Sequence, residues 1–150
     1  MKYWAFTLLA FTLFIGSCSQ VDQKQVDKDL IEGYISSNNL NAEEIENGLF
    51  VVIDQKGSGT TPDINSKVKV HYRGTLLDGT QFDSSYDRGE PATFFLWQVI
   101  EGWQIGIPEF KAGGKGKILV PSHLGYGENP QGTIPGNSVL VFDIELLEVL

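Results

Sequence analysis

Few residues in this sequence of 150 have side chains that commonly do covalent chemistry. It contains one cysteine, Cys18, and two histidines, His71 and His123. Nucleophilic hydrolysis needs a nucleophile beside a base, and neither histidine stands in such a pattern. One cysteine and two histidines also supply neither a disulfide nor the four ligands of a zinc site. We therefore expect no metal, no cofactor, and neither thiol nor hydrolytic chemistry.

Glycine-rich stretches and paired carboxylates are the next candidates for chemistry. The runs at 57–59 and 113–117 lack the spacing and the final Ser or Thr of a phosphate loop, so we interpret both as turns. Asp83 and Asp87 allow acid–base catalysis in principle, although aspartates are commoner as turn residues. Neither pattern predicts a reactive site.

Aromatic residues are the distinctive feature that remains. Six of them fall in or beside predicted inward faces: Tyr72, Phe82, Phe94, Trp103, Tyr126 and Phe142. On pattern alone, such residues most often belong to the core.

The amino-acid composition limits the classes of protein to which this sequence can belong. With 41% hydrophobic and 20% charged residues, the chain is typical of one compact globular domain. Lys and Arg number 11 against 19 Asp and Glu, a formal net charge of -8 without a local basic stripe. An acidic surface repels polyphosphate, so we expect no nucleic-acid partner.

The N-terminal residues have the pattern of an export signal. Lys2 precedes an apolar run over residues 3–15, and Gly16, Ser17 and Cys18 follow. The run is too short to span a bilayer, because thirteen residues at about 1.5 Å each cover less than about 30 Å. The segment before Cys18 resembles the lipobox of bacterial lipoproteins, in which that cysteine is acylated. We therefore predict a lipoprotein signal peptide over residues 1–17 and a lipid anchor on Cys18.

Residues 18–47 are polar and contain one amphipathic pattern. Apolar residues recur at spacings of three and four from Val26 to Ile35, which predicts a helix that ends near residues 36–39. We interpret this segment as a solvated spacer, in preference to a helix that binds a partner. A role in dimerisation has no support in the sequence, and the oligomeric state is open.

From residue 48 onward the apolar period changes to two, which predicts strands. Apolar and polar residues alternate at 67–73 and at 138–147, with further short strands at 49–53, 93–96 and 115–120. Asp78 and Gly79 predict a hairpin with a two-residue turn in which both residues have positive φ. His71 falls on the solvent face of its strand, so we do not expect it to be a catalytic residue.

One stretch breaks this pattern. Residues 99–110 have a helical apolar face, with Gly102 and Gly106 spaced for close packing and Pro108 near the end. One helix among several strands predicts a single α+β domain over residues 48–150.

Several segments of this domain resemble FKBP-type peptidyl-prolyl isomerases in order and in spacing. They are residues 70–74, 78–79, 82–85, 99–103, 121–127, 134–135 and 140–146. The resemblance implies an antiparallel sheet of five to six strands wrapped around one short helix, here preceded by the N-terminal amphipathic helix.

The resemblance also implies a pocket for proline, with Trp103 as its floor. It assigns catalysis to Tyr72, Phe82, Asp83, Trp103, Tyr126 and Phe142. It assigns substrate binding to Phe94, Val99, Ile100, Ile134 and Arg88, with Arg88 paired to Asp83.

The expected function is peptidyl-prolyl cis-trans isomerisation that assists the folding of exported proteins in the bacterial cell envelope. Its partners are proline-containing polypeptides. The alternative is a proline-peptide-binding chaperone of weak or no activity, or an accessory lipoprotein of an envelope complex.

Overall fold

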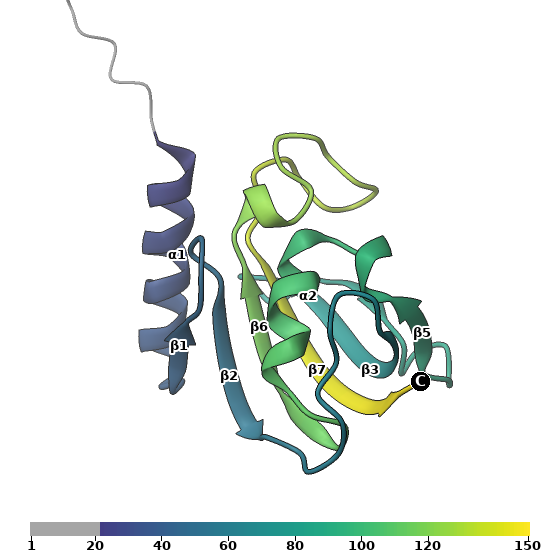
Figure 1. The fold of residues 1–150 in the computed structure, drawn as a ribbon. Coiled ribbons are helices and arrows are strands. Elements are labelled where there is room, and N and C mark those ends of the chain that lie inside the picture. The colour runs from purple at the N-terminus through teal and green to yellow at the C-terminus, as the bar shows by residue number, and fades with distance from the viewer. Residues whose placement is uncertain (1–21) are drawn as a thin grey trace, which may run out of the picture.

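The chain folds as an antiparallel β-sheet with one helix on each face (Figure 1). The structure is a computed structural model that describes residues 22–150. The sheet order is β1-β2-β6-β7-β3-β4, and β5 pairs with the same edge of β3 as β4 does. The strands are β1 (Ala42–Glu44), β2 (Phe50–Gln55), β3 (Lys67–Leu76), β4 (Gln81–Ser84), β5 (Ala92–Phe95), β6 (Gly114–Val120) and β7 (Leu140–Val149).

The helices are α1 and α2, and three short 3₁₀ turns accompany them. The α-helices are α1 (Gln23–Ser37) and α2 (Glu101–Gly106). The 3₁₀ turns are η1 (Leu96–Gln98), η2 (Ile107–Glu109) and η3 (Ser122–Leu124). The predicted α+β architecture is confirmed, with seven strands instead of five or six. Of these, the three-residue β1 lies in the segment predicted to be a spacer.

Strand β3 shows the predicted alternation. Val68, Val70 and Tyr72 are buried, whereas Lys67 and Arg73 are exposed. This is the pattern of a strand with one face on the core and one toward water.

The hairpin between β3 and β4 differs from the prediction. Only Gly79 of the expected pair has positive φ, at 87°, and its N–H bonds to the carbonyl of Leu76 at 3.0 Å. The Leu76 N–H bonds to the Thr80 carbonyl at 2.9 Å, so the loop contains three residues. Such loops place a glycine in the left-handed region at a bulge, and the register shifts next to Thr75. The predicted two-residue turn is therefore wrong, although the hairpin is present.

Helix α2 is shorter than the predicted helix over residues 99–110. Pro108 lacks the N–H that an α-helix would use there, and the chain tightens into η2 at Ile107. Gly102 and Gly106 face β6, where an added Cβ would lie 2.8 Å from a methyl carbon of Val120 or Ile118. These glycines let the helix backbone lie directly on the sheet, and Trp103 between them is buried.

Helix α1 packs on the opposite face of the sheet. Its Ile31 is fully buried in a second apolar cluster with Phe50 and Val52 of β2 and Leu119 of β6. Because both faces of the sheet are covered here, Phe50, Val51 and Val52 are buried in succession. The prediction of a solvated spacer is wrong for the described part of this segment, because α1 and β1 belong to the packed domain. Within residues 22–150, no helix combines the length and apolarity needed to cross a membrane.

Candidate functional site

A cavity of about 560 Å³ opens on the same side of the sheet as α2. Its walls come from strands β3, β4, β5 and β7, from η1 and α2, and from the loop that follows η3. The lining residues are Tyr72, Phe82, Asp83, Phe94, Gln98, Val99, Ile100, Trp103, Tyr126, Gln131, Ile134 and Phe142. Seven of these twelve have apolar aromatic or aliphatic side chains, two are tyrosines, two are glutamines and one is an aspartate.

Trp103 is the point at which the aromatic walls meet. Its ring meets those of Tyr72, Phe94 and Phe142 edge to face, with centroids 5.1, 5.7 and 5.2 Å apart. Edge-to-face contact is a favoured arrangement of aromatic pairs, so these rings stabilise one another. Only 4% of Trp103 is exposed. Trp103 is therefore a buried residue of the cavity lining, against which three other aromatic residues of the lining pack.

Phe82 reaches the cavity because β3 has a glycine beneath it. A Cβ added at Gly74 would lie 2.6 Å from Cζ of Phe82 and 3.0 Å from Cε1 of Phe142. Those two rings meet edge to face at 5.6 Å. Gly74 thus makes room for two walls of the pocket at once.

One polar cluster borders these apolar walls. The Tyr72 hydroxyl donates to Oδ2 of Asp83, and Arg88 Nη1 donates to Oδ1 at 2.5 Å. Arg88 Nη2 also donates to the Tyr72 oxygen at 2.9 Å, and its guanidinium lies 5.4 Å from the centre of the Tyr72 ring. Both Asp83 oxygens are therefore held, and the three side chains form one closed network.

The network shifts the pKa values of its members. Burial raises the pKa of the Asp83 carboxyl, but hydrogen bonds from Tyr72 and Arg88 and the charge of Arg88 outweigh it, and the pKa lies below its ordinary value. Burial and the hydrogen bond to Asp83 raise the pKa of Tyr72, although Arg88 opposes this. At neutral pH the site therefore presents an ionised carboxylate and a neutral phenol.

The loop after η3 supplies the remaining wall. Tyr126 is 38% exposed, and Ile134 is buried. Burial, with a contribution from the charge of Asp83, raises the pKa of Tyr126, so its hydroxyl keeps its proton at neutral pH. A backbone bridge joins Gln131 to Ile134 within this loop.

The structure brings together ten of the residues named from the sequence, and Arg88 joins them from behind Asp83. Cys18 lies outside the described residues. Sequence reasoning missed Gln98 and Gln131, because Gln98 ends the short 3₁₀ turn η1 and Gln131 lies in the loop after η3, and neither segment is long enough to show a periodic pattern. Their amides add hydrogen-bonding groups at the edge of an otherwise apolar cavity.

Neither histidine lines the cavity. His71 stacks on Tyr86 with ring centroids 4.5 Å apart, and its Nδ1 lies 2.9 Å from Oγ of Ser85. His123 is part of η3, and both of its ring nitrogens are buried. Among the described residues, no group of three or more His, Cys, Asp or Glu is placed to hold a metal ion.

Comparison with known proteins identifies relatives of this chain. The FKBP-type isomerase FkpA of Aeromonas hydrophila is 45% identical over an alignment 139 residues long, which includes gaps and covers 87% of this chain and 52% of that protein. FkpA of Escherichia coli K12 is 39% identical over an alignment 150 residues long, which covers 95% of this chain and 55% of the relative. The chain thus spans about half the length of the curated relatives it matches.

Solved structures show the same fold. The crystal structure of Escherichia coli FkpA matches with a TM-score of 0.77 at 41% identity, over 85% of this chain and 59% of that one. AtFKBP13 matches with a TM-score of 0.68 at 35% identity, over 73% of this chain and 99% of that one. The model of the family described as FKBP-type peptidyl-prolyl cis-trans isomerase matches residues 58–147, which include all twelve residues of the cavity. This chain belongs to the FKBP-type peptidyl-prolyl cis-trans isomerase family.

Proposed function

We propose that this protein catalyses cis-trans isomerisation of Xaa-Pro peptide bonds in polypeptides that are still folding. The observation that carries the proposal is the aromatic cavity floored by Trp103 and bordered by the single carboxylate of Asp83. Its volume of about 560 Å³ suits a proline ring with neighbouring backbone. Membership of the family supports the same activity.

The reaction needs no bond to be made or broken. Rotation about the peptide bond has a barrier of about 18–20 kcal/mol, because the planar amide is stabilised by resonance between oxygen and nitrogen. In the twisted transition state this resonance is lost, and the carbonyl is less polar than in the planar amide. A site that favours the twisted amide over the planar one accelerates rotation.

The apolar walls supply that preference in the proposed mechanism. Phe82, Phe94, Trp103 and Phe142 replace water around the prolyl amide with aromatic surface. Water stabilises the more polar planar carbonyl, so its removal lowers the free energy of the twisted form relative to the planar one. The edge-to-face contacts keep the walls in place without a substrate, which limits the cost of reorganisation.

The polar groups hold the peptide while the bond rotates. Asp83 is ionised and fixed by Tyr72 and Arg88, so it offers an oriented dipole and charge beside the cavity. The protonated Tyr126 hydroxyl and the backbone of Ile134 lie on the opposite loop and bind the peptide carbonyls in this proposal. Directed polar contacts at the edge of an apolar cavity are the usual source of orientation in such sites.

The test is cis-trans exchange of short Xaa-Pro peptides, measured by NMR with the full chain purified in mild detergent. The protein should bring exchange from tens of seconds or longer to well below one second at about 25 °C. Asp83→Ala should lower this acceleration at least about tenfold. Asp87→Ala is the matched control, because Asp87 is an exposed aspartate outside the cavity.

The possible outcomes separate the two functions that the sequence left open. Acceleration that Asp83→Ala lowers and Asp87→Ala preserves supports the isomerase. Exchange as slow as in buffer, from a folded chain and across several residues before proline, contradicts it. If proline peptides then still perturb the resonances of the cavity residues, the chain is a binding module.

We further propose that the protein works in the bacterial cell envelope, attached to a membrane through acylated Cys18. The support is the signal pattern of residues 1–17 and the small residues before Cys18. Acyl chains contribute about 0.8 kcal/mol per buried methylene, and two chains suffice for stable anchoring. Labelled palmitate should be incorporated into the parent chain and not into Cys18→Ala. Equal labelling of both chains would contradict the anchor.

A further inference from the structure

The carboxylate of Asp27 is buried on the side of the sheet away from the cavity. It belongs to α1 and has no exposed surface, and it is the one fully buried charged residue among residues 22–150. Its Oδ2 accepts hydrogen bonds from the backbone N–H of Ser122 at 2.8 Å and from the Ser122 hydroxyl at 2.6 Å. Its Oδ1 accepts from Nε2 of Gln23 at 2.7 Å. A buried charge is tolerated when it is hydrogen-bonded in this way.

The partner of Asp27 is the first residue of η3, where the chain leaves β6 for the loop that forms the cavity wall. The carbonyl of Ser122 accepts from the N–H of Gly125 at 3.0 Å and from that of Gly127 at 2.8 Å. The residue between those two glycines is Tyr126. Both neighbours of Tyr126 are therefore hydrogen-bonded to Ser122, which is the residue that Asp27 binds.

The same bonds close the loop at its base. The Gly127 carbonyl accepts from the N–H of Asn137 at 2.7 Å, so residues 127 and 137 are joined. Between them the described structure contains one isolated bridge, Gln131 to Ile134, and most of the loop is exposed. Apart from Ile134, which is buried in the main core, the loop depends on its ends for its position. In Figure 1 this loop rises above the sheet, at the same upper end of the molecule as the start of α1.

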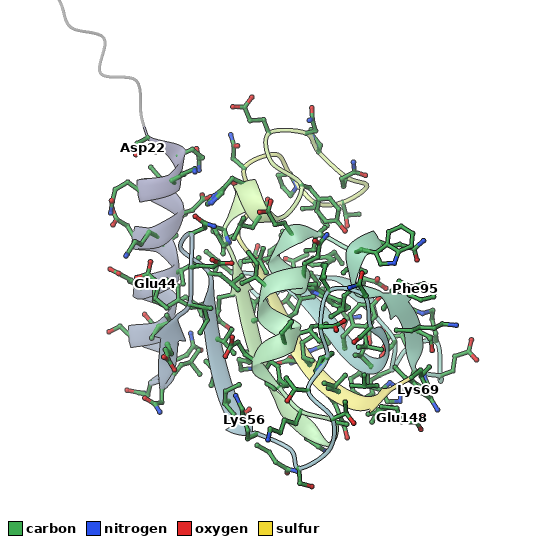
Figure 2. The ribbon with its side chains drawn as sticks, in the orientation of Figure 1. Asp22, Glu44, Lys56, Lys69, Phe95 and Glu148 are labelled. Atoms are coloured by element: carbon green, nitrogen blue, oxygen red, sulfur yellow. The ribbon has the colours of Figure 1, made fainter. Side chains whose placement is uncertain are left out.

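Helix α1 is a rigid support for this contact. Ile31, one turn after Asp27, is fully buried against β2 and β6. The N-terminus of α1 is capped by Asp22, which is labelled at the upper end of the helix in Figure 2 and whose side chain accepts from the N–H of Lys24 at 3.1 Å. Asp27 is thus fixed to the sheet through its own helix, independently of the loop.

We propose that Asp27 is a positioning residue of the isomerase site, which acts through Ser122 to set the place of Tyr126. The inference rests on the proposed function and adds α1 to the parts of the molecule that determine the activity. Asp27 lies on the other side of the sheet and does not line the cavity. Its influence passes through Ser122, Gly127 and the backbone of Tyr126.

The test compares Asp27→Ala, Asp27→Asn and Ser122→Ala with Ile31→Ala in the full chain. Ile31→Ala is the matched control, because it weakens the packing of α1 but removes no bond to η3, while Tyr34 and Ile35 still pack α1 against the same apolar cluster. Asp27→Asn keeps the shape and one acceptor oxygen, so it remains available if Asp27→Ala does not fold. All variants are assayed at a temperature at which circular dichroism shows them folded.

Asp27→Ala should lower kcat/KM for Xaa-Pro peptides about tenfold, which is within the hundredfold that a misplacement of about 1 Å can cost. Asp27→Asn and Ser122→Ala should lower it less, and Ile31→Ala should change it less than about twofold. In a Tyr126→Ala background, the effect of Asp27→Ala should shrink to less than about twofold, because the two residues act on the same step. If Asp27 only stabilised the fold, Asp27→Ala would lower kcat/KM by the same factor in the parent chain and in the Tyr126→Ala chain.

Backbone NMR gives a second measurement that does not depend on activity. The amide resonances of Gly125 and Gly127 should move in Asp27→Asn and stay in place in Ile31→Ala. The proposal is overturned if folded Asp27→Asn and Ser122→Ala keep the parent kcat/KM, or if Ile31→Ala loses as much. A parent chain that does not accelerate exchange overturns the proposed function instead, which the parent assay detects before any variant is compared.

Discussion

Nη1 of Arg88 lies 2.5 Å from Oδ1 of Asp83, and the two side chains are 45% and 43% exposed. A charge pair in contact with water thus borders an apolar cavity. An exposed pair of this kind contributes little to stability, usually less than about 1 kcal/mol. The pair helps to hold the pKa of the Asp83 carboxyl below its ordinary value, so we expect Arg88 to influence the pH dependence of activity.

Replacing Arg88 should change the acid limb of the pH profile. Because the pKa of Asp83 lies below its ordinary 3.8, the parent kcat/KM should be flat from about pH 8 to about pH 5. It should fall only when the carboxylate is protonated, as the pH drops through that lowered pKa. In Arg88→Gln the pKa of Asp83 rises, so the fall should begin at a higher pH. Titration of the Asp83 carboxyl carbon by NMR checks the shift directly, and identical profiles in both chains would contradict it.

Removing the Tyr72 hydroxyl should reduce activity without unfolding the chain. Tyr72→Phe deletes the donor to Oδ2 of Asp83 and the acceptor of Arg88 Nη2, but it keeps the ring that contacts Trp103. Loss of one hydrogen bond to a charged group corresponds to about 1.5 kcal/mol, or about tenfold in kcat/KM.

The control for that change is Tyr86→Phe. Its hydroxyl is 3.5 Å from Oε2 of Glu145, and its ring lies outside the cavity. Peptide kinetics should show no more than about a twofold effect for this variant. Equal losses in the two tyrosine variants would argue against a special role for the Tyr72 hydroxyl.

Trp103 and Trp97 should respond differently to a bound peptide. Trp103 is the 4% exposed floor of the cavity, whereas Trp97 is 56% exposed and does not line it. Of these two tryptophans, only Trp103 should change its surroundings when a proline peptide fills the cavity. Trp97→Phe should therefore keep the change in tryptophan emission on titration with peptide, and Trp103→Phe should lose it. The opposite result would place the peptide outside the cavity.

Gly102→Ala should damage both stability and activity. Its Cβ would meet both methyl carbons of Val120, so α2 must move off β6 and carry Trp103 with it. Overpacking of this kind costs about 1–3 kcal/mol, measured by chemical denaturation. Val120→Ala in the same chain should restore part of the loss, because it removes the two methyl groups.

Gly33→Ala is the matched control in the other helix. Nothing lies within 4 Å of a Cβ added there, so the substitution should stabilise the chain by up to about 1 kcal/mol through helix propensity. A loss of stability in Gly33→Ala as large as in Gly102→Ala would show that packing against β6 is not the cause.

Much of the fold follows from local pattern. The alternation in β3 and the apolar periods of α1 and α2 predicted those elements, because each needs only one buried face. The resemblance to a family named the cavity residues, and the structure brings ten of them around one space. Gln98 and Gln131 followed from neither source, because a 3₁₀ turn of three residues and a loop carry no periodic signal.

The sequence by itself therefore determined which faces are apolar and which aromatic residues are available for a pocket. Only the tertiary structure decided what each face meets. The amphipathic pattern of α1 is equally consistent with a spacer and with a packed helix, and packing placed Ile31 on the sheet and Asp27 against Ser122. The physical reason is that a buried carboxylate needs partners 95 residues away in the chain, and no local pattern encodes a hydrogen bond of that separation.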